Sequence, residues 1–113
     1  MALNTYLKLE GESGKEYGFI VYSLEQEYKE GVIAIYAFIK ENIAGIIEVI
    51  YIGQTTDLSQ RFINHHKEEK IEEYQATHIA IRIEQEDQLD KVEKDLIKKH
   101  NPPCNDHYTK KPL

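Results

Sequence analysis

Residues 32–54 read VIAIYAFIKENIAGIIEVIYIGQ, and this stretch decides the fold. Its first part, VIAIYAFI (32–39), is apolar and rich in β-branched and aromatic residues, which is typical of a strand buried on both faces. ENIAG has the composition of a turn, and IIEVIYI (46–52) predicts a second strand. Because the connection is short, we expect the two strands to pair antiparallel.

The second strand leads into a predicted helix over about residues 57–69. We interpret Gly53 as the break that lets the chain turn tightly from strand to helix, and Asp57 as the N-cap. One face of this helix, at i, i+3, i+4 and i+7, carries Leu58, Arg61, Phe62 and His65. A stripe that faces the core should be apolar, so the arginine and the histidine require an explanation.

Two further elements follow along the chain. THIAIRI (77–83) alternates strictly, which predicts a third strand with isoleucines on one face and a wetter opposite face. DQLDKVEKDLIKKH (87–100) predicts a helix with Asp87 as its N-cap, basic residues in its last turn and a stop at the prolines 102–103. These elements predict an α+β fold in which helices flank a three-stranded antiparallel sheet.

The first thirty residues predict an extension of this domain. TYLKLE (5–10) and YGFIVY (17–22) have the composition of strands, and the glycine-bearing loop between them indicates a hairpin. Ser23 and Gln26 have capping-box spacing, so we expect a short helix over 24–30. We place the extension at 1–30, the main domain at 31–106 and a basic tail at 107–113.

Composition limits the class of protein. The chain has 113 residues, 41% of them hydrophobic and 30% charged, as expected for one globular domain. It contains no apolar run of the roughly 20 residues that a membrane span needs, and its start lacks the features of a signal peptide. With a single cysteine, Cys104, no internal disulfide forms, and we expect a cytoplasmic protein without a membrane partner.

Charge is acidic overall but unevenly distributed. The net charge of −6 argues against a protein that coats nucleic acid through charge alone. Residues 98–113, however, contain four lysines against the single acid Asp106. A polyanion would therefore approach most readily at the C-terminal end.

Glu93 lies in the middle of the apolar stripe of the last predicted helix, among Leu89, Val92, Leu96 and Ile97. A buried carboxylate needs a cation or strong hydrogen-bond donors. One interpretation is a structural ion pair with Arg61 that ties two helices to the sheet. The other places both residues on one cleft floor, where the arginine binds a phosphate and the glutamate ligates Mg²⁺.

An ordered set of residues resembles the GIY-YIG nuclease superfamily. It comprises AIY (34–36), YIG (51–53), Arg61, His65, Glu93 and the Asn105 that ends LIKKHNPPCN, and it covers about residues 31–106. The resemblance implies a three-stranded antiparallel sheet flanked by helices, and a phosphodiester-cleaving activity that uses one divalent ion, Mg²⁺ or Mn²⁺.

The resemblance also implies a role for each residue. Glu93 would ligate the metal, and Arg61 would stabilise charge on the phosphate oxygens. Tyr36, helped by His65, would accept a proton from the attacking water or orient it, and Tyr51 would position water or phosphate. Asn105 would brace the site.

The sequence departs from the family pattern at two positions. Ala34 replaces the first glycine, and Gln54 follows YIG where repair-type members carry a lysine. With few basic contacts, affinity for nucleic acid should be low and should fall with salt. We expect substrate contacts at Gly53, Gln54, Lys67 and Lys70, with DNA favoured over RNA and with delivery by a partner as one alternative.

Two other classes of function stay open from the sequence. One is a catalytically silent module that binds nucleic acid or protein and retains the fold. The other is a structural module that forms a homodimer through the second strand of the N-terminal hairpin, because that apolar strand could be an exposed edge.

Overall fold

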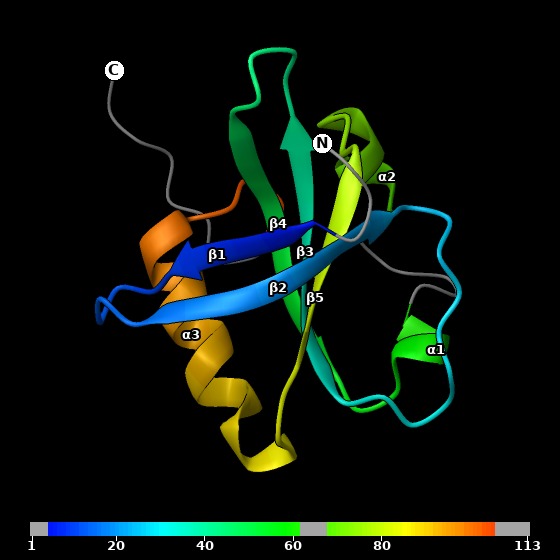
Figure 1. Cartoon of the computed structure of the whole chain (residues 1–113), viewed down its shortest axis with the longest axis vertical. Helices are drawn as coiled ribbons and strands as arrows, with labels where there is room; N and C mark the ends of the chain where they lie inside the picture. The colour runs from blue at the N-terminus through cyan, green and yellow to red at the C-terminus, as the bar shows by residue number, and fades with distance from the viewer. Residues whose placement is uncertain (1–4, 62–67, 106–113) are drawn as a thin grey trace.

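The computed structural model describes residues 5–61 and 68–105, and it shows an α+β fold built on one antiparallel sheet (Figure 1). The sheet order is β1-β2-β5-β3-β4. The strands are β1 (Tyr6–Glu10), β2 (Glu16–Ser23), β3 (Ala34–Glu41), β4 (Ile47–Thr55) and β5 (His78–Ile83). The described helices are α1 (Leu58–Arg61), α2 (Glu68–Glu73), the 3₁₀ turn η1 (Glu86–Gln88) and α3 (Leu89–His100).

The predicted pairing of the two strands in 32–54 is confirmed. β3 pairs antiparallel with β4 from Ala34↔Thr55 to Glu41↔Ile47, and it pairs with β5 on its other side. Residues 34–37 are fully buried, as expected for a strand covered on both faces. The register shifts between Phe38 and Ile39, so Ile50 is an extra residue of β4, as in a β-bulge.

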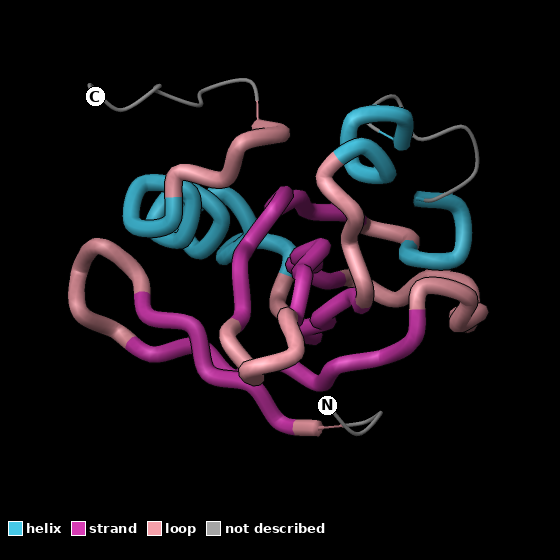
Figure 2. Tube along the Cα trace, turned by 90° about the horizontal axis from the view of Figure 1, so that it is seen from above, coloured by secondary structure: helices cyan, strands magenta, loops and turns pink. Residues whose placement is uncertain are grey.

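Helices cover both faces of the sheet (Figure 2). On one face, α3 packs through Leu89, Val92 and Leu96 against a cluster that includes Ile35 and Ile52. On the other face, Leu58 of α1 and Ile71 of α2 pack against a cluster that includes Tyr36, Tyr51 and Ile81. Residues that alternate along β3 and β4 therefore belong to two separate hydrophobic clusters.

The N-terminal hairpin is part of this sheet. β1 pairs with β2 from Tyr6↔Ile20 to Glu10↔Glu16, and β2 pairs with β5 from Ile20↔Ile81 to Ser23↔His78. The expectation that β2 is an exposed edge is wrong, because β2 has a neighbouring strand on each side. β1 is the edge strand at this end of the sheet.

The short helix predicted over 24–30 does not form. Gln26 N donates to the carbonyl of Ser23 over 3.3 Å, which closes only a turn. Tyr28 packs edge-on against Tyr22 of β2, with ring centroids 6.0 Å apart. So short a segment gains little from helical hydrogen bonds, and packing on the sheet decides its conformation.

The helix predicted over 57–69 is described only at its two ends, as α1 and α2. The role of Asp57 at its start is confirmed, because its carboxylate accepts hydrogen bonds from the backbone N–H of Ser59 and of Gly31, both over 3.1 Å. The hydroxyl of Ser59 also donates to it over 2.7 Å. These bonds, led by that of the hydroxyl, hold the pKa of Asp57 below its ordinary value.

Three local predictions are corrected by the structure. Gly53 lies within β4, which continues to Thr55, so it is not the strand break. The predicted wetter face of β5 is wrong at Ala80, which is fully buried because this face packs against the cluster beneath α3. Asp87 does not cap α3, because helical backbone already begins with η1 after the extended Gln85.

The end of α3 agrees with the sequence. Asn101 has a left-handed backbone conformation, with φ of 44°, and its N–H donates to the carbonyl of Ile97 over 2.8 Å. The two prolines follow. Over the described residues, no helix has the length and apolarity to cross a membrane.

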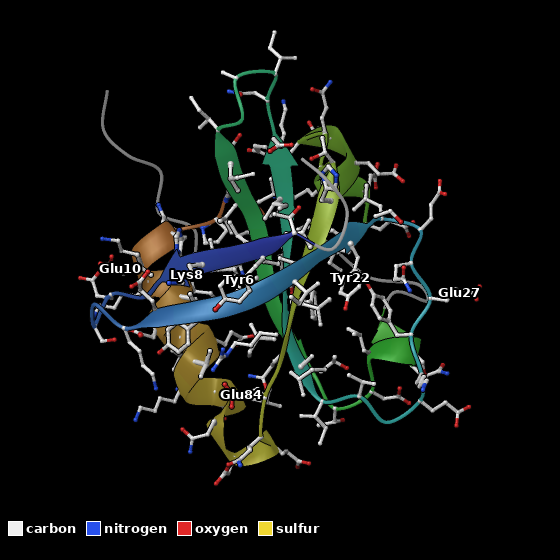
Figure 3. All side chains as sticks on the ribbon, viewed as in Figure 1. Tyr6, Lys8, Glu10, Tyr22, Glu27 and Glu84 are labelled. Atoms are coloured by element: carbon white, nitrogen blue, oxygen red, sulfur yellow. The ribbon has the colours of Figure 1, made fainter. Side chains whose placement is uncertain are left out.

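Negative charge is spread over several elements. Glu10 on β1 and Glu27 in the loop after β2 are both exposed (Figure 3). These carboxylates would repel a polyanion locally.

Candidate active site

Apart from Lys70, the predicted site residues whose side chains the structure describes meet at residues 51–54 of β4. Tyr36 of β3 is directly opposite Gly53 in the strand pairing. A Cβ atom on Gly53 would overlap the phenol ring of Tyr36. Gly53 is thus required because the ring lies over its backbone, a close approach that only glycine allows.

The two tyrosines lie on the same face of the sheet. Their ring centroids are 6.1 Å apart, and Tyr36 also contacts Phe38 edge-on at 6.0 Å. Tyr36 has no exposed surface, whereas 7% of Tyr51 is exposed. Of the two phenols, Tyr51 therefore has the better access to water.

Asn105 holds the outer edge of β4. Its side-chain amide donates to the carbonyl of Ile52 over 2.8 Å and accepts from the N–H of Ile52 over 3.0 Å. Cys104 N donates to the carbonyl of Ile50 over 3.0 Å. The segment after α3 thus bonds to the backbone of Ile50 and Ile52, as a short additional strand would.

Glu93 reaches the same strand from the other face of the sheet. Its carboxylate accepts a hydrogen bond from Nε2 of Gln54 over 3.3 Å, and Asp90 accepts one from the same nitrogen over 2.6 Å. Glu93 is half-buried, so it is not sealed from solvent. The tyrosines and Glu93 consequently flank β4 on opposite faces rather than lining a single surface.

Asp90 was not predicted as a site residue. Its sequence signal was its position three residues before Glu93, which places both carboxylates on neighbouring positions of a helix surface. What the sequence does not reveal is that Gln54 joins them.

Asp90 and Glu93 bring two carboxylates together beside Gln54, and carboxylates are common ligands of hard divalent cations. Mg²⁺ takes oxygen ligands and is commonly held by one or two carboxylates together with water and substrate phosphate. Within residues 5–61 and 68–105, no cluster of three or more His, Cys, Asp or Glu side chains is placed to hold a metal. Gln54 turns its amide nitrogen to both carboxylates, so Asp90 and Glu93 are the candidate metal ligands of this group.

The basic residues predicted for the site are only partly described. The side chain of Arg61 and all of His65 and Lys67 lie outside the described residues. Lys70 is exposed on α2. Phosphate binding by these basic residues stays a prediction.

Comparisons with known proteins do not place this chain in a family: no family model matches the sequence, and no curated protein or solved structure gives a significant match.

Proposed function

We propose that this protein is a metal-dependent endonuclease of the GIY-YIG type that hydrolyses phosphodiester bonds in nucleic acid, with DNA as the preferred substrate. One observation carries the proposal. Tyr36, Glu93 and Asn105, distant in sequence, all contact the four-residue segment 51–54 of β4. Residues that carry the sequence resemblance thus contact the YIG tripeptide or the Gln54 that follows it, from both faces and the outer edge of β4.

The sheet gives further support. β4, β3 and β5 are consecutive in the sheet order and antiparallel, which agrees with a three-stranded GIY-YIG core that the N-terminal hairpin extends. Asn105 fixes the backbone between Tyr51 and Gly53 at the outer edge of this unit. The site would therefore stand on rigid strand backbone rather than on a loop.

Each residue has a role that follows from its surroundings. Glu93, assisted by Asp90, would hold one Mg²⁺ or Mn²⁺, which polarises the scissile phosphate when bound. Tyr51 is the more exposed phenol but lies on the opposite face of β4 from Glu93, so it would position this strand rather than the attacking water. Tyr36, enclosed beneath it, would act as a positioning residue. Arg61 would balance the charge that develops on the phosphate oxygens.

A cleavage assay tests the proposal. The protein is incubated with single-stranded, duplex and branched DNA and with RNA, in Mg²⁺ or Mn²⁺ and then in EDTA. We expect cleavage that EDTA abolishes and that Glu93→Gln reduces at least about 100-fold, the scale on which lost charge stabilisation lowers a rate. Glu86→Gln, an exposed acid of η1, is the matched control and should retain full activity.

Full burial of Tyr36 and the net charge of −6 favour a second candidate, a silent binding module that kept the fold. Binding of any of these substrates without cleavage, in either metal, would support that candidate. Cleavage that is equal in Glu93→Gln and wild type would refute the assignment of the acid.

A further inference from the structure

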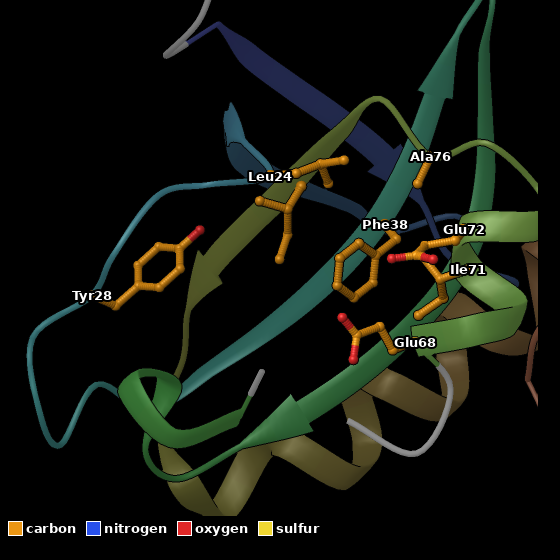
Figure 4. Close-up of a pocket in the computed structure, with 8 residues that line it drawn as sticks. Leu24, Tyr28, Phe38, Glu68, Ile71, Glu72 and Ala76 are labelled. Carbon is orange, nitrogen blue, oxygen red and sulfur yellow. The ribbon is translucent and has the colours of Figure 1, made fainter. Parts of the chain in front are cut away.

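A cavity of about 310 Å³ lies between α2 and the sheet (Figure 4). Phe38 of β3 and Ile79 of β5 contribute from the sheet, Ile71 from α2, and Leu24 and Tyr28 from the segment after β2. Its volume is at the lower end of the range for small-molecule pockets, and its lining is largely apolar and aromatic, as such pockets usually are. A cavity of about 150 Å³ already holds benzene, so this one has room for a ring with a short side chain.

Two carboxylates stand at this cavity. Glu68 and Glu72 are one helical turn apart on α2 and both line it, and Figure 4 shows their carboxylates beside the Phe38 ring. Both residues are exposed, in contrast to Ile71 between them, which is buried. The described residues that line the cavity include no lysine or arginine.

The spacing of Glu68 and Glu72 brings two like charges together on α2. Like charges four residues apart repel on a helix, and a carboxylate in the last turn, as at Glu72, opposes the helix dipole. A bound cation would relieve both effects. An apolar hollow with two acids at its opening therefore matches a ligand with an apolar body and a positive head.

We propose that this cavity binds a small organic cation of the arylalkylamine class. The ring packs against Phe38 and Ile79, and the protonated amine lies between the carboxylates of Glu68 and Glu72. Aromatic residues in the lining favour the cation further through their ring faces. A nucleotide is disfavoured as the ligand, since the same two acids would repel its phosphate. This cavity lies on the face of the sheet opposite Glu93, although its Phe38 contacts Tyr36, and binding of the amine does not depend on cleavage activity.

Binding is measured by calorimetry and by amide chemical shifts with the full-length protein. The probe is phenethylamine, compared with 2-phenylethanol, which has nearly the same shape without charge, and 3-phenylpropionate, which is negative. We expect saturable binding of the amine, about tenfold weaker binding of the alcohol and none of the acid, because two partly exposed ion pairs are worth about this factor.

Two matched double variants test the carboxylates. Glu68→Gln/Glu72→Gln should weaken binding of the amine about tenfold and leave the affinity for the alcohol unchanged. Glu69→Gln/Glu73→Gln removes the same charge at the same spacing from positions of α2 that do not line the cavity, and should bind like wild type. Equal affinity of amine and alcohol, equal loss in both variants, or no saturable binding of phenethylamine would overturn the proposal.

Discussion

Among single residues, Gly53 allows another side chain to pack where its own Cβ atom would be. The phenol ring of Tyr36 occupies the space where any other side chain at position 53 would begin. Tyr36 is fully buried and Gly53 is buried, so neither can yield towards solvent. The pair therefore couples the AIY and YIG segments directly.

Gly53→Ala should destabilise the protein by about 1–3 kcal/mol, the usual cost of overpacking a core. Urea denaturation measures the change in the free energy of unfolding. In a Tyr36→Phe background the cost should be smaller, because the hydroxyl is among the atoms that the new methyl group meets. Strict additivity of the two substitutions would show that the ring and the glycine are not in contact.

Asp95 is a second residue that links distant segments. Its carboxylate accepts from the backbone N–H of Ser13 over 2.9 Å, from the Ser13 hydroxyl over 2.7 Å and from the Tyr17 hydroxyl over 2.7 Å. These bonds, those of Ser13 first, hold the pKa of Asp95 below its ordinary value. Burial, with the hydrogen bond to Asp95 second, raises the pKa of Tyr17 to about 12, so this phenol stays protonated and donating at neutral pH.

Because the folded state lowers the pKa of Asp95, its contribution to stability is complete above the ordinary carboxyl pKa and is lost as pH falls through the lowered value. Asp95→Ala should cost about 1–2 kcal/mol at pH 7 through its lost hydrogen bonds. The difference from wild type should shrink as pH falls below about 4, near the pKa of a free carboxyl. Urea denaturation from pH 7 to 2 measures it, with the exposed acid variant Asp87→Ala as control. A difference independent of pH would contradict this account.

At the scale of elements, Asn105 replaces a neighbouring strand at the edge of β4. Asn105→Ala removes both of its hydrogen bonds to Ile52. We expect a loss of about 2 kcal/mol and faster hydrogen exchange at the Ile52 amide. Asn42→Ala is a matched control, because its side chain accepts from Ala44 and Ile46 in the turn at the other end of β4. If Ile52 exchanges equally in both variants, Asn105 does not protect this edge.

Elements whose pattern is local could be predicted from the sequence. The buried strand at 32–39, its antiparallel partner and the stop of α3 at the prolines each depend on neighbours a few residues away. The helix over 24–30 was wrong because the packing of Tyr28 on Tyr22 outweighs a local capping pattern. The sequence also predicted Glu93 and Asn105 as candidate site residues. It could not predict the contact of Gln54 with Asp90, because that contact depends on how α3 packs.

At the scale of the whole molecule, the hairpin and the remainder share one core. Tyr17, Phe19 and Val21 of β2 belong to the same cluster as Ile35, Ile52 and Leu96. β2 also pairs with β5 along the side of that strand that faces away from β3. A boundary near residue 30 therefore does not separate two independent hydrophobic cores.

Because the core is shared, we expect the N-terminal hairpin to be necessary for stable folding. Removing residues 1–23 would expose its apolar surface and lose the burial of three large β2 side chains, each worth about 2 kcal/mol. That sum is comparable with the total stability of a domain, about 5–15 kcal/mol, so the remaining fragment should lack a cooperative thermal transition. Circular dichroism and calorimetry measure this, alongside full-length Phe19→Ala, which should stay folded but lose about 3–5 kcal/mol. A fragment 24–113 that melts cooperatively near the full-length temperature would instead make the hairpin a dispensable addition to a self-sufficient sheet of β5, β3 and β4.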